Sequence, residues 1–298
     1  MSNETDPLSL ADAPLPRSGE PTRCIQSIRQ IQRRYDVVIC DIWGVVHDGL
    51  RAFPEAVRAL RAMRAAGVKV MLVSNTQKAS AQIPAELAAL GVDEDAWNAI
   101  FTSGDATRRL LRARSEQPAY VISSKLDCAT LDAWEVNKAP LENAHFIFAV
   151  SLPEGTSPQD HLPLLVAVAE RDLELVCANP DVQVRVGDAL QWCAGALAAA
   201  YIELGGRVVM AGKPFSPIYD LVLAQLDSGI DMDRVLAIGD GIATDIRGAN
   251  MMGIDCVFVA SGVHGETLKR NGRVHPALLG QTLRAQGAWC DFVMDRLA

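Results

Sequence analysis

Residues 35–49 read YDVVICDIWGVVHDG, and the rest of the chain can be placed around this stretch. Its apolar run at 37–40 is typical of a buried strand. The run ends at Asp41, and Gly44 follows closely enough to permit a sharp turn. Because open α/β sheets bind ligands at the carboxyl ends of their strands, we interpret Asp41 as a nucleophile at such an edge.

The composition indicates a globular α/β protein. Hydrophobic residues make up 49% of the chain, which is ample for a core, and only 5% of the residues are aromatic. Ala, Val and Leu therefore carry the hydrophobic content, as in parallel sheets that are covered on both faces. The net charge of −8 and the lack of a Lys/Arg cluster argue against a nucleic-acid partner.

The cysteines and the apolar segments exclude several further classes. The seven cysteines are scattered and form no CxxC pair, so the sequence predicts neither a zinc site nor a disulfide framework. No segment has the charged start and apolar centre of a signal peptide, and no apolar run approaches the length of a membrane span. We therefore expect a cytoplasmic protein that does not contact a membrane.

Strands and helices are expected to alternate along the chain. A strand, a helix and a strand come first, a long insertion follows, and the same pattern returns near the C-terminus. This order predicts an α/β fold, a doubly wound parallel sheet with a second α/β domain inserted in it. The expected units are a mostly disordered lead-in at 1–22, a core domain in two parts at 23–104 and 206–298, and an inserted domain at 105–205.

Each candidate strand of the core sheet ends in a polar residue. These strand ends are Asp41, Ser74, Lys213 at the end of 207–213, and Asp240. Because the carboxyl ends of parallel strands meet at one edge of a sheet, we expect all four side chains to converge on one crevice.

Three carboxylates are expected in this crevice, those of Asp41, Asp240 and Asp245. Two like charges about 4 Å apart repel by roughly 4 kcal/mol at an effective dielectric constant near 20, so the cluster needs a proton or a cation. Mg²⁺ fits best, because it accepts few protein ligands and keeps waters for a phosphate. The alternative is that Asp240 and Asp245 only stabilise the N-terminus of the following helix.

Two further strand ends could bind phosphate. The Ser74 hydroxyl and the backbone N–H groups around Asn75 could hold phosphate oxygens, although an ordinary helix N-cap is the alternative. Lys213, in AGKPFSP, could neutralise the nucleophile and the phosphate, although surface exposure is the commoner fate of a lysine.

In this order, these motifs resemble the haloacid dehalogenase-like (HAD) superfamily, class IIA, the NagD type, over about residues 35–265. Asp41 matches the first motif, Ser74 with Asn75 the second, Lys213 with Pro214 the third, and Asp240 with Asp245 the fourth. The insertion has the position of that class's C2-type cap. Asn179-Pro180-Asp181 resembles the end of the cap in that class, which implies that Asn179 and Asp181 face the site as substrate-binding residues.

The resemblance also implies a mechanism. Asp41 attacks phosphorus to form an aspartyl-phosphate, which water then hydrolyses. Asp41 and Asp240 hold Mg²⁺, Asp245 lies beside or behind them, and the backbone carbonyl of residue 43 completes the protein ligands. Ser74 and Lys213 hold the phosphoryl group while the cap closes over it. The resemblance thus implies a Mg²⁺-dependent phosphohydrolase for a small phosphorylated metabolite, of the sugar phosphate or nucleoside monophosphate class.

The chain departs from the family at Trp43, which gives DxW in place of DxD. Phosphatases of the superfamily carry there an Asp that protonates the leaving group, whereas an indole N–H is only a hydrogen-bond donor. Three outcomes are open. His47 or its neighbour Asp48 takes over the acid/base role. Or the leaving group needs little protonation. Or the protein binds a phosphorylated ligand with vestigial turnover.

Alternatives remain for these residues and for the reaction. His47 could be a turn histidine, and Trp43 a hydrophobic plug between core and cap. An aromatic residue at this position also resembles the superfamily's dehalogenases, which need no Mg²⁺, but Asp240 and Asp245 favour phosphate chemistry. The only partner that we expect is the small phosphorylated substrate, apart from a possible homodimer through an apolar face of the cap.

Overall fold

We analysed a computed structural model, which describes residues 22–127, 131–132, 134–186, 189–226, 229–265 and 267–298. The expected lead-in at 1–22 lies outside these residues except for Thr22. No helix in the described part of the chain is both long and apolar enough to cross a membrane.

The first sheet has seven strands, all parallel, in the order β1-β15-β12-β11-β2-β3-β4. Their bounds are β1 Arg23–Cys24, β2 Val37–Asp41, β3 Lys69–Ser74, β4 Ala99–Thr102, β11 Val235–Gly239, β12 Asp255–Val259 and β15 Phe292–Met294. From β2 the chain builds outward through β3 and β4, and it later returns to build the other side from β11. The topological switch point, where such sheets bind ligands, therefore lies between β2 and β11.

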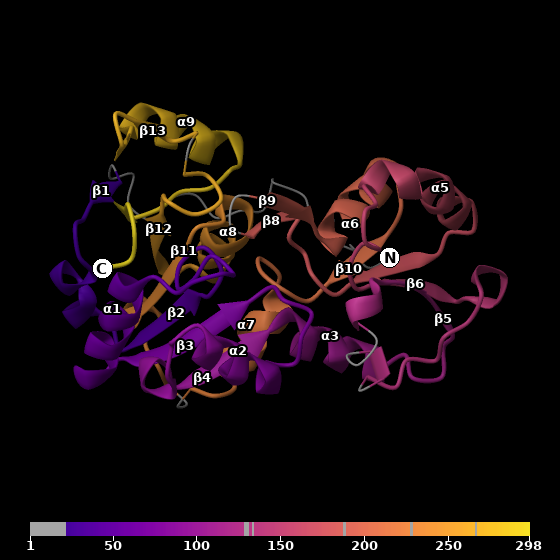
Figure 1. The fold of residues 1–298 in the computed structure, drawn as a ribbon, viewed down its shortest axis with the longest axis horizontal. Coiled ribbons are helices and arrows are strands. Elements are labelled where there is room, and N and C mark those ends of the chain that lie inside the picture. Colours follow the sequence, from indigo (N-terminus) through magenta and orange to yellow (C-terminus); the bar gives the residue numbers. More distant parts are fainter. Residues whose placement is uncertain (1–21, 128–130, 133, 187–188, 227–228, 266) are drawn as a thin grey trace.

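Helices cover both faces of this sheet (Figure 1). Alternate residues of β2 belong to two different cores, because successive side chains of a strand point to opposite faces. Val38 and Cys40 pack with Leu60 of α1, whereas Val37 and Ile39 share the other core with Ile218 of α7. The helices are α1 Pro54–Ala65, α2 Ile83–Ala89, α3 Ser103–Arg112, α7 Ser216–Leu223, α8 Arg247–Met252 and α9 Pro276–Ala285.

A second sheet of four parallel strands, in the order β10-β7-β6-β5, forms the other lobe in Figure 1. Its strands are β5 Ala119–Ile122, β6 Phe146–Ala149, β7 Glu174–Cys177 and β10 Val208–Met210. One face packs on α5 (Leu162–Glu170) and α6 (Ala194–Glu203), through Leu165, Leu197 and Tyr201. The predicted α/β class, a doubly wound parallel sheet with a further α/β unit inserted, is thus confirmed.

Short elements join these layers. They are the hairpin strands β8 Gln183–Val186 and β9 Ala189–Trp192, the pair β13 Lys269–Arg270 and β14 Arg273–Val274, the π-helical turn η10 Ile242–Ile246, and the 3-10 turns η2 Ile28–Gln30, η3 Gln32–Arg34, η4 Ser80–Gln82, η5 Glu94–Ala96, η6 Lys125–Asp127, η7 Leu141–Asn143, η8 Pro158–His161 and η9 Met232–Arg234.

One predicted strand pairs in the other sheet. We expected 207–213 to be a core strand that ends at Lys213, but β10 pairs with β7 in the second sheet. The physical reason is the crossover through α6, which leads the chain from β7 to the adjacent parallel position. The second sheet therefore extends past 205, the predicted end of the insertion, and Lys213 lies on the connection that leaves it.

Candidate active site

Asp41, at the carboxyl end of β2, is held from two sides. Its Oδ1 accepts the backbone N–H of Ile42 at 2.8 Å and a hydrogen bond from Lys213 Nζ at 2.6 Å. Only 8% of the residue is exposed. Burial, followed by the charge of Asp245, raises the pKa of Asp41 well above its ordinary value. The surroundings therefore destabilise the ionised form of this carboxylate, and a nearby cation would stabilise it.

Asp240 and Asp245 approach Asp41 from the next strand. Asp240 directly follows β11, and Asp245 lies in the π-helical turn after it. Burial and then Asp245 raise the pKa of Asp240 to about 7. Gly44, at φ +82°, permits the close approach, because a Cβ there would lie 2.2 Å from Asp240 Oδ2. Strand order at the switch point thus brings together residues that are far apart in the sequence.

The three carboxylates form a site that suits a hard dication. One oxygen from each of Asp41, Asp240 and Asp245 lies within 4.8 Å of the others, and all three residues are buried. In the described part of the chain this is the one such group of potential metal ligands. Three carboxylates face the single ammonium of Lys213, so a negative surplus remains. Oxygen donors with surplus negative charge are what Mg²⁺ or Ca²⁺ requires.

Lys213 is buried rather than on the surface, with 3% exposure. Its Nζ donates to Asp41 Oδ1, to Asp245 Oδ1 at 2.7 Å and to the carbonyl of Val73 at 3.2 Å. Burial alone would lower the pKa of Lys213, but Asp245 and Asp41 outweigh it and raise the pKa well above its ordinary value. The side chain therefore stays charged beside the nucleophile.

Asn75 positions Lys213 instead of reaching the cavity with its own amide. Its Oδ1 accepts the Lys213 backbone N–H at 2.7 Å, and its Nδ2 donates to the Lys213 carbonyl at 3.1 Å. The same Nδ2 donates to Asp181 Oδ1 at 2.9 Å. The side-chain amide of Asn75 is thus used within the protein, whereas phosphate binding by the backbone N–H groups around Asn75 stays a prediction. Ser74 lines the cavity, and its Oγ accepts the Thr76 N–H at 3.2 Å.

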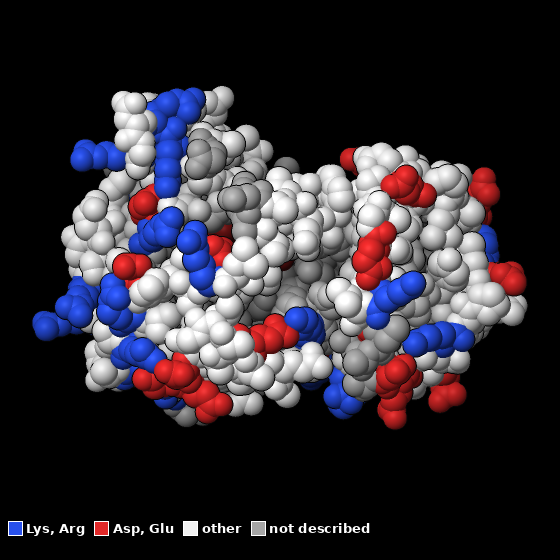
Figure 2. Space-filling model, in the orientation of Figure 1, with Lys and Arg blue, Asp and Glu red and all other residues white. Residues whose placement is uncertain are grey.

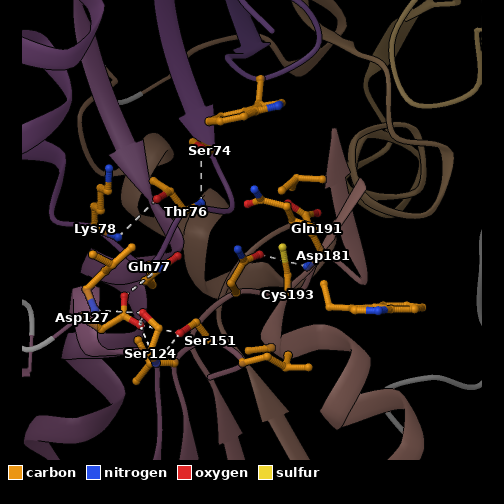
Figure 3. Close-up of a pocket in the computed structure, with 18 of the residues that line it drawn as sticks. Ser74, Thr76, Gln77, Lys78, Ser124, Asp127, Ser151, Asp181, Gln191 and Cys193 are labelled. Carbon is orange, nitrogen blue, oxygen red and sulfur yellow. Dashed lines mark hydrogen bonds between the residues drawn. The ribbon is translucent and has the colours of Figure 1, made fainter. Parts of the chain in front are cut away.

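Asn179 and Asp181 lie on the segment that follows β7 and line the same cavity. Figure 3 shows Asp181 in its wall. Asn179 Oδ1 accepts the backbone N–H of Asp181 at 3.0 Å, which fixes the turn. Burial raises the pKa of Asp181, and the nearby Lys213 opposes the rise. Asp181 therefore links the second sheet to Asn75 and to the acidic cluster.

His47 lies beside Trp43 in the turn after β2, and both residues line the cavity. Its Nδ1 accepts the Gly49 N–H at 2.9 Å, and its ring meets the Trp43 ring edge to face with centroids 5.0 Å apart. Burial lowers the pKa of His47 to about 4, so the imidazole is neutral near pH 7 and is a poor general acid. Asp48 accepts the N–H groups of Leu50 and Arg51 and does not line the cavity.

The cavity, of about 900 Å³, lies between the two sheets and meets Asp41 through its neighbours Ile42, Trp43 and Ser74. Figure 2 shows this face hollowed between the two lobes. In Figure 3, Ser74, Thr76 and Gln77 face Asp181 and Gln191 across it. A volume of this size accommodates a small phosphorylated molecule.

Sequence reasoning missed a second polar group in the cavity wall, centred on Asp127. Its carboxylate accepts hydrogen bonds from Gln77 Nε2 at 2.9 Å, from Ser124 Oγ at 2.9 Å and from the Ser151 hydroxyl. Ser124 and Ser151 follow β5 and β6, so the carboxyl ends of the second sheet also face the cavity (Figure 3). The strand-end rule, applied to that sheet, would have identified both serines.

Comparisons with known proteins identify relatives of this arrangement. A family model described as haloacid dehalogenase-like hydrolase matches residues 38–137, and a HAD-hydrolase-like model matches 210–285. A solved hydrolase of the haloacid dehalogenase-like family from Brucella suis 1330 is 35% identical, with a TM-score of 0.80 over 92% of this chain and 100% of that chain.

Two curated relatives are more distant. The 5'-nucleotidase YutF of Bacillus subtilis (strain 168) is 23% identical, over 78% of this chain and 89% of its own length. The ribonucleotide monophosphatase NagD of Escherichia coli (strain K12) is 26% identical, over 76% of this chain and 88% of its own length.

Proposed function

The chain belongs to the haloacid dehalogenase-like hydrolases, class IIA, and we propose that it is a Mg²⁺-dependent phosphohydrolase of small phosphate monoesters. One observation carries this proposal. Asp41 accepts a hydrogen bond from the ammonium of Lys213 and clusters with the carboxylates of Asp240 and Asp245, beside a cavity of about 900 Å³. A carboxylate so placed is a nucleophile whose charge is balanced by lysine and metal.

The residues divide the work by their chemistry. Asp41, Asp240, Asp245 and the backbone carbonyl of Trp43 would hold Mg²⁺, which supplies positive charge to the phosphoryl oxygens. Asp41 attacks phosphorus, so that the Asp41 O–P bond forms as the bond to the leaving oxygen breaks. Lys213 and the Ser74 hydroxyl hold the phosphoryl oxygens, and Asn75 keeps Lys213 in place.

The names of the relatives support phosphate monoesters as substrates. YutF is a 5'-nucleotidase and NagD a ribonucleotide monophosphatase by name. We accordingly propose the sugar phosphate and nucleoside monophosphate classes as the first substrates to test. The second sheet acts as a cap, and its residues Asn179 and Asp181 contact the substrate from the far wall.

Trp43 favours a second candidate function, a phospho-ligand-binding protein with vestigial turnover. A positioned acid/base is typically worth about 10²–10⁴ in rate, and neither Trp43 nor the neutral His47 supplies one. A Trp43→Asp variant separates the two functions. A gain in turnover indicates a lost acid, whereas a loss indicates that Trp43 belongs to a working site. Activity that is indifferent to EDTA would instead indicate dehalogenase-like hydrolysis at carbon.

The test is a screen of phosphorylated metabolites for phosphate release, with Mg²⁺ and with EDTA. We expect release only with Mg²⁺, and none from Asp41→Asn. The matched control is Asp36→Asn, which precedes the other end of the same strand and pairs with Arg234 at the surface. Release by Asp41→Asn at the control's rate would disprove the nucleophile assignment. Ligand binding without release would support the second candidate.

A further inference from the structure

Trp43 forms a fixed wall of the cavity beside the nucleophile. The edge of its ring system meets His47, and a Cβ on Gly49 would lie 2.5 Å from Trp43 Cζ2. Atoms that close on two sides of the ring hold it in place. The space next to the phosphoryl position is therefore occupied by an apolar aromatic surface.

Two acidic side chains of the cavity are already engaged as hydrogen-bond acceptors, whereas Glu154 also lines the cavity and is exposed to solvent. Asp127 accepts from Gln77, Ser124 and Ser151, and Glu86 accepts from Lys78 Nζ at 2.6 Å. These bonds tie both carboxylates to other residues of the cavity wall.

Asp181 and Glu154 are the two carboxyl groups of the cavity that could still donate a proton to the leaving group. Asp181 lines the cavity, and its Oδ1 accepts the Asn75 amide at 2.9 Å. Its contact with Asn75 places it beside the backbone of Lys213 and thus next to the phosphate-holding residues. The experiment below distinguishes a proton donor at Asp181 or Glu154 from no donor at all.

The wall opposite the first sheet is unusually apolar for exposed protein surface. Leu190 and Trp192 on β9 are 51% and 40% exposed, Leu126 is 86% exposed, and all three line the cavity. Large apolar side chains that stay exposed around one cavity mark a ligand-binding surface. A tryptophan presents a flat face on which an aromatic ring can stack.

We propose that this cavity selects aryl phosphates, in which a flat aromatic alcohol is the leaving group. The inference rests on the proposed phosphohydrolase function and narrows its substrate class. A phenolic hydroxyl has a pKa of about 10, whereas water has a pKa of about 16 and aliphatic alcohols are similarly weak acids. A phenolate therefore departs without a proton donor. Trp43 and Trp192 are then the specificity-determining residues, one on each wall of the cavity.

The chemical step balances without an acid. The Asp41 O–P bond forms and the P–O(aryl) bond breaks, and its electron pair leaves with the aryl oxygen as phenolate. Water then adds to phosphorus and the Asp41 O–P bond breaks, its electron pair returning to the Asp41 carboxylate. One proton of that water stays on the phosphate and the other passes to solvent. Solvent finally protonates the phenolate.

The test compares phenyl phosphate with benzyl phosphate, which share an aromatic ring but differ in the acidity of the leaving alcohol. For the wild-type protein with Mg²⁺, we expect kcat/KM to be at least about 10²-fold higher for phenyl phosphate, the size of a missing acid. The ratio should fall in Trp43→Asp. A wild-type ratio near one overturns the proposal, and a ratio that then rises in Asp181→Asn or in Glu154→Gln identifies that residue as the acid.

A second measurement tests the aromatic wall. In Trp192→Ala, we expect kcat/KM for 1-naphthyl phosphate to fall about tenfold relative to that for acetyl phosphate, which has a good leaving group without a ring. An unchanged ratio overturns stacking on Trp192. The Asp41→Asn variant separates this proposal from the proposed phosphohydrolase function. If the variant releases no phosphate, the assignment of Asp41 as the nucleophile is supported, whatever the ratios of kcat/KM between substrates are. If the wild-type protein releases phosphate from none of these esters, both proposals fall.

Discussion

Lys213 Nζ donates a hydrogen bond to Asp41 Oδ1 at 2.6 Å across 172 residues of sequence. The ammonium also reaches Asp245, so it holds two carboxylates that would otherwise repel each other. This contact joins β2 to the connection that returns from the second sheet. The stability of the fold and the chemistry of the site therefore depend on the same lysine.

Replacing Lys213 by Met should destabilise the metal-free protein strongly. Removal of one partner from a buried charge pair typically costs about 3–5 kcal/mol, because the remaining charges are left uncompensated. Urea unfolding with and without Mg²⁺ measures this, and added Mg²⁺ should restore part of the loss. The control is Lys78→Met, whose pair with Glu86 is exposed and worth at most about 1 kcal/mol. Equal losses in the two variants would contradict the role of Lys213.

Asn75 and Asn250 provide a matched pair for testing positioning. Each buried amide both accepts from the backbone N–H and donates to the carbonyl of one partner residue, Lys213 for Asn75 and Trp289 for Asn250. Alanine at either position should cost about 1–3 kcal/mol of stability, because buried backbone groups lose their partners. Only Asn75→Ala should also lower kcat, by about 10²-fold, because it misplaces Lys213. A similar fall in kcat for Asn250→Ala would show that Asn75 acts through stability alone.

Metal binding should depend on pH through Asp240. The pKa of Asp240 in the folded protein is raised to about 7. In the metal-free protein, the protonated carboxyl therefore contributes its full stability when the pH is below the ordinary pKa of an aspartic acid, and this stability is lost as the pH rises through about 7. The affinity for Mg²⁺ changes with pH in the opposite direction, because the ion must displace that proton. Calorimetry should therefore show Mg²⁺ affinity that rises up to about pH 7, with proton release below it.

Two variants test this proton linkage. Asp240→Asn should remove the part of the pH dependence that is centred near pH 7, along with most of the affinity. Asp291→Asn should retain both, although burial also raises the pKa of Asp291, because that carboxylate binds the Cys256 N–H away from the cluster. A pH-independent affinity in the wild-type protein would contradict the assignment of Asp240 as a ligand.

The sequence predicts the strand ends of the first sheet well, for a physical reason. The runs before Asp41 and Asp240 are buried on both faces, so they are continuously apolar, and the first polar residue marks the edge of the sheet. Lys213 reaches the same cluster by another route. The short run at 208–210 is compatible with either sheet, and only the preceding crossover through α6 decides its partner.

The far wall of the cavity was much less predictable. The β8–β9 hairpin carries its apolar side chains toward the cavity instead of a core, so its pattern does not follow the rule that links hydrophobicity to burial. Asp127 lies in a 3-10 turn, and its partners come from the residues that follow β5 and β6 and from the loop after β3. Such a constellation exists only after the second sheet has formed.

Gly49 should prove specifically intolerant of a side chain, because it fixes the Trp43 ring. Its φ is +87°, and that of Gly67 is +89°, so alanine strains the backbone equally at both positions, by about 1–2 kcal/mol. At Gly67 nothing lies within 4 Å of the added Cβ, whereas at Gly49 the Cβ would meet the Trp43 ring at 2.5 Å. Overpacking of this kind adds roughly 1–3 kcal/mol.

Gly49→Ala should therefore lower the free energy of unfolding by more than Gly67→Ala does. Only Gly49→Ala should also shift the phenyl-to-benzyl ratio of kcat/KM, since it moves the wall beside the nucleophile. Equal effects of the two substitutions on stability and on that ratio would show that the ring moves freely and that the wall is not built by this turn.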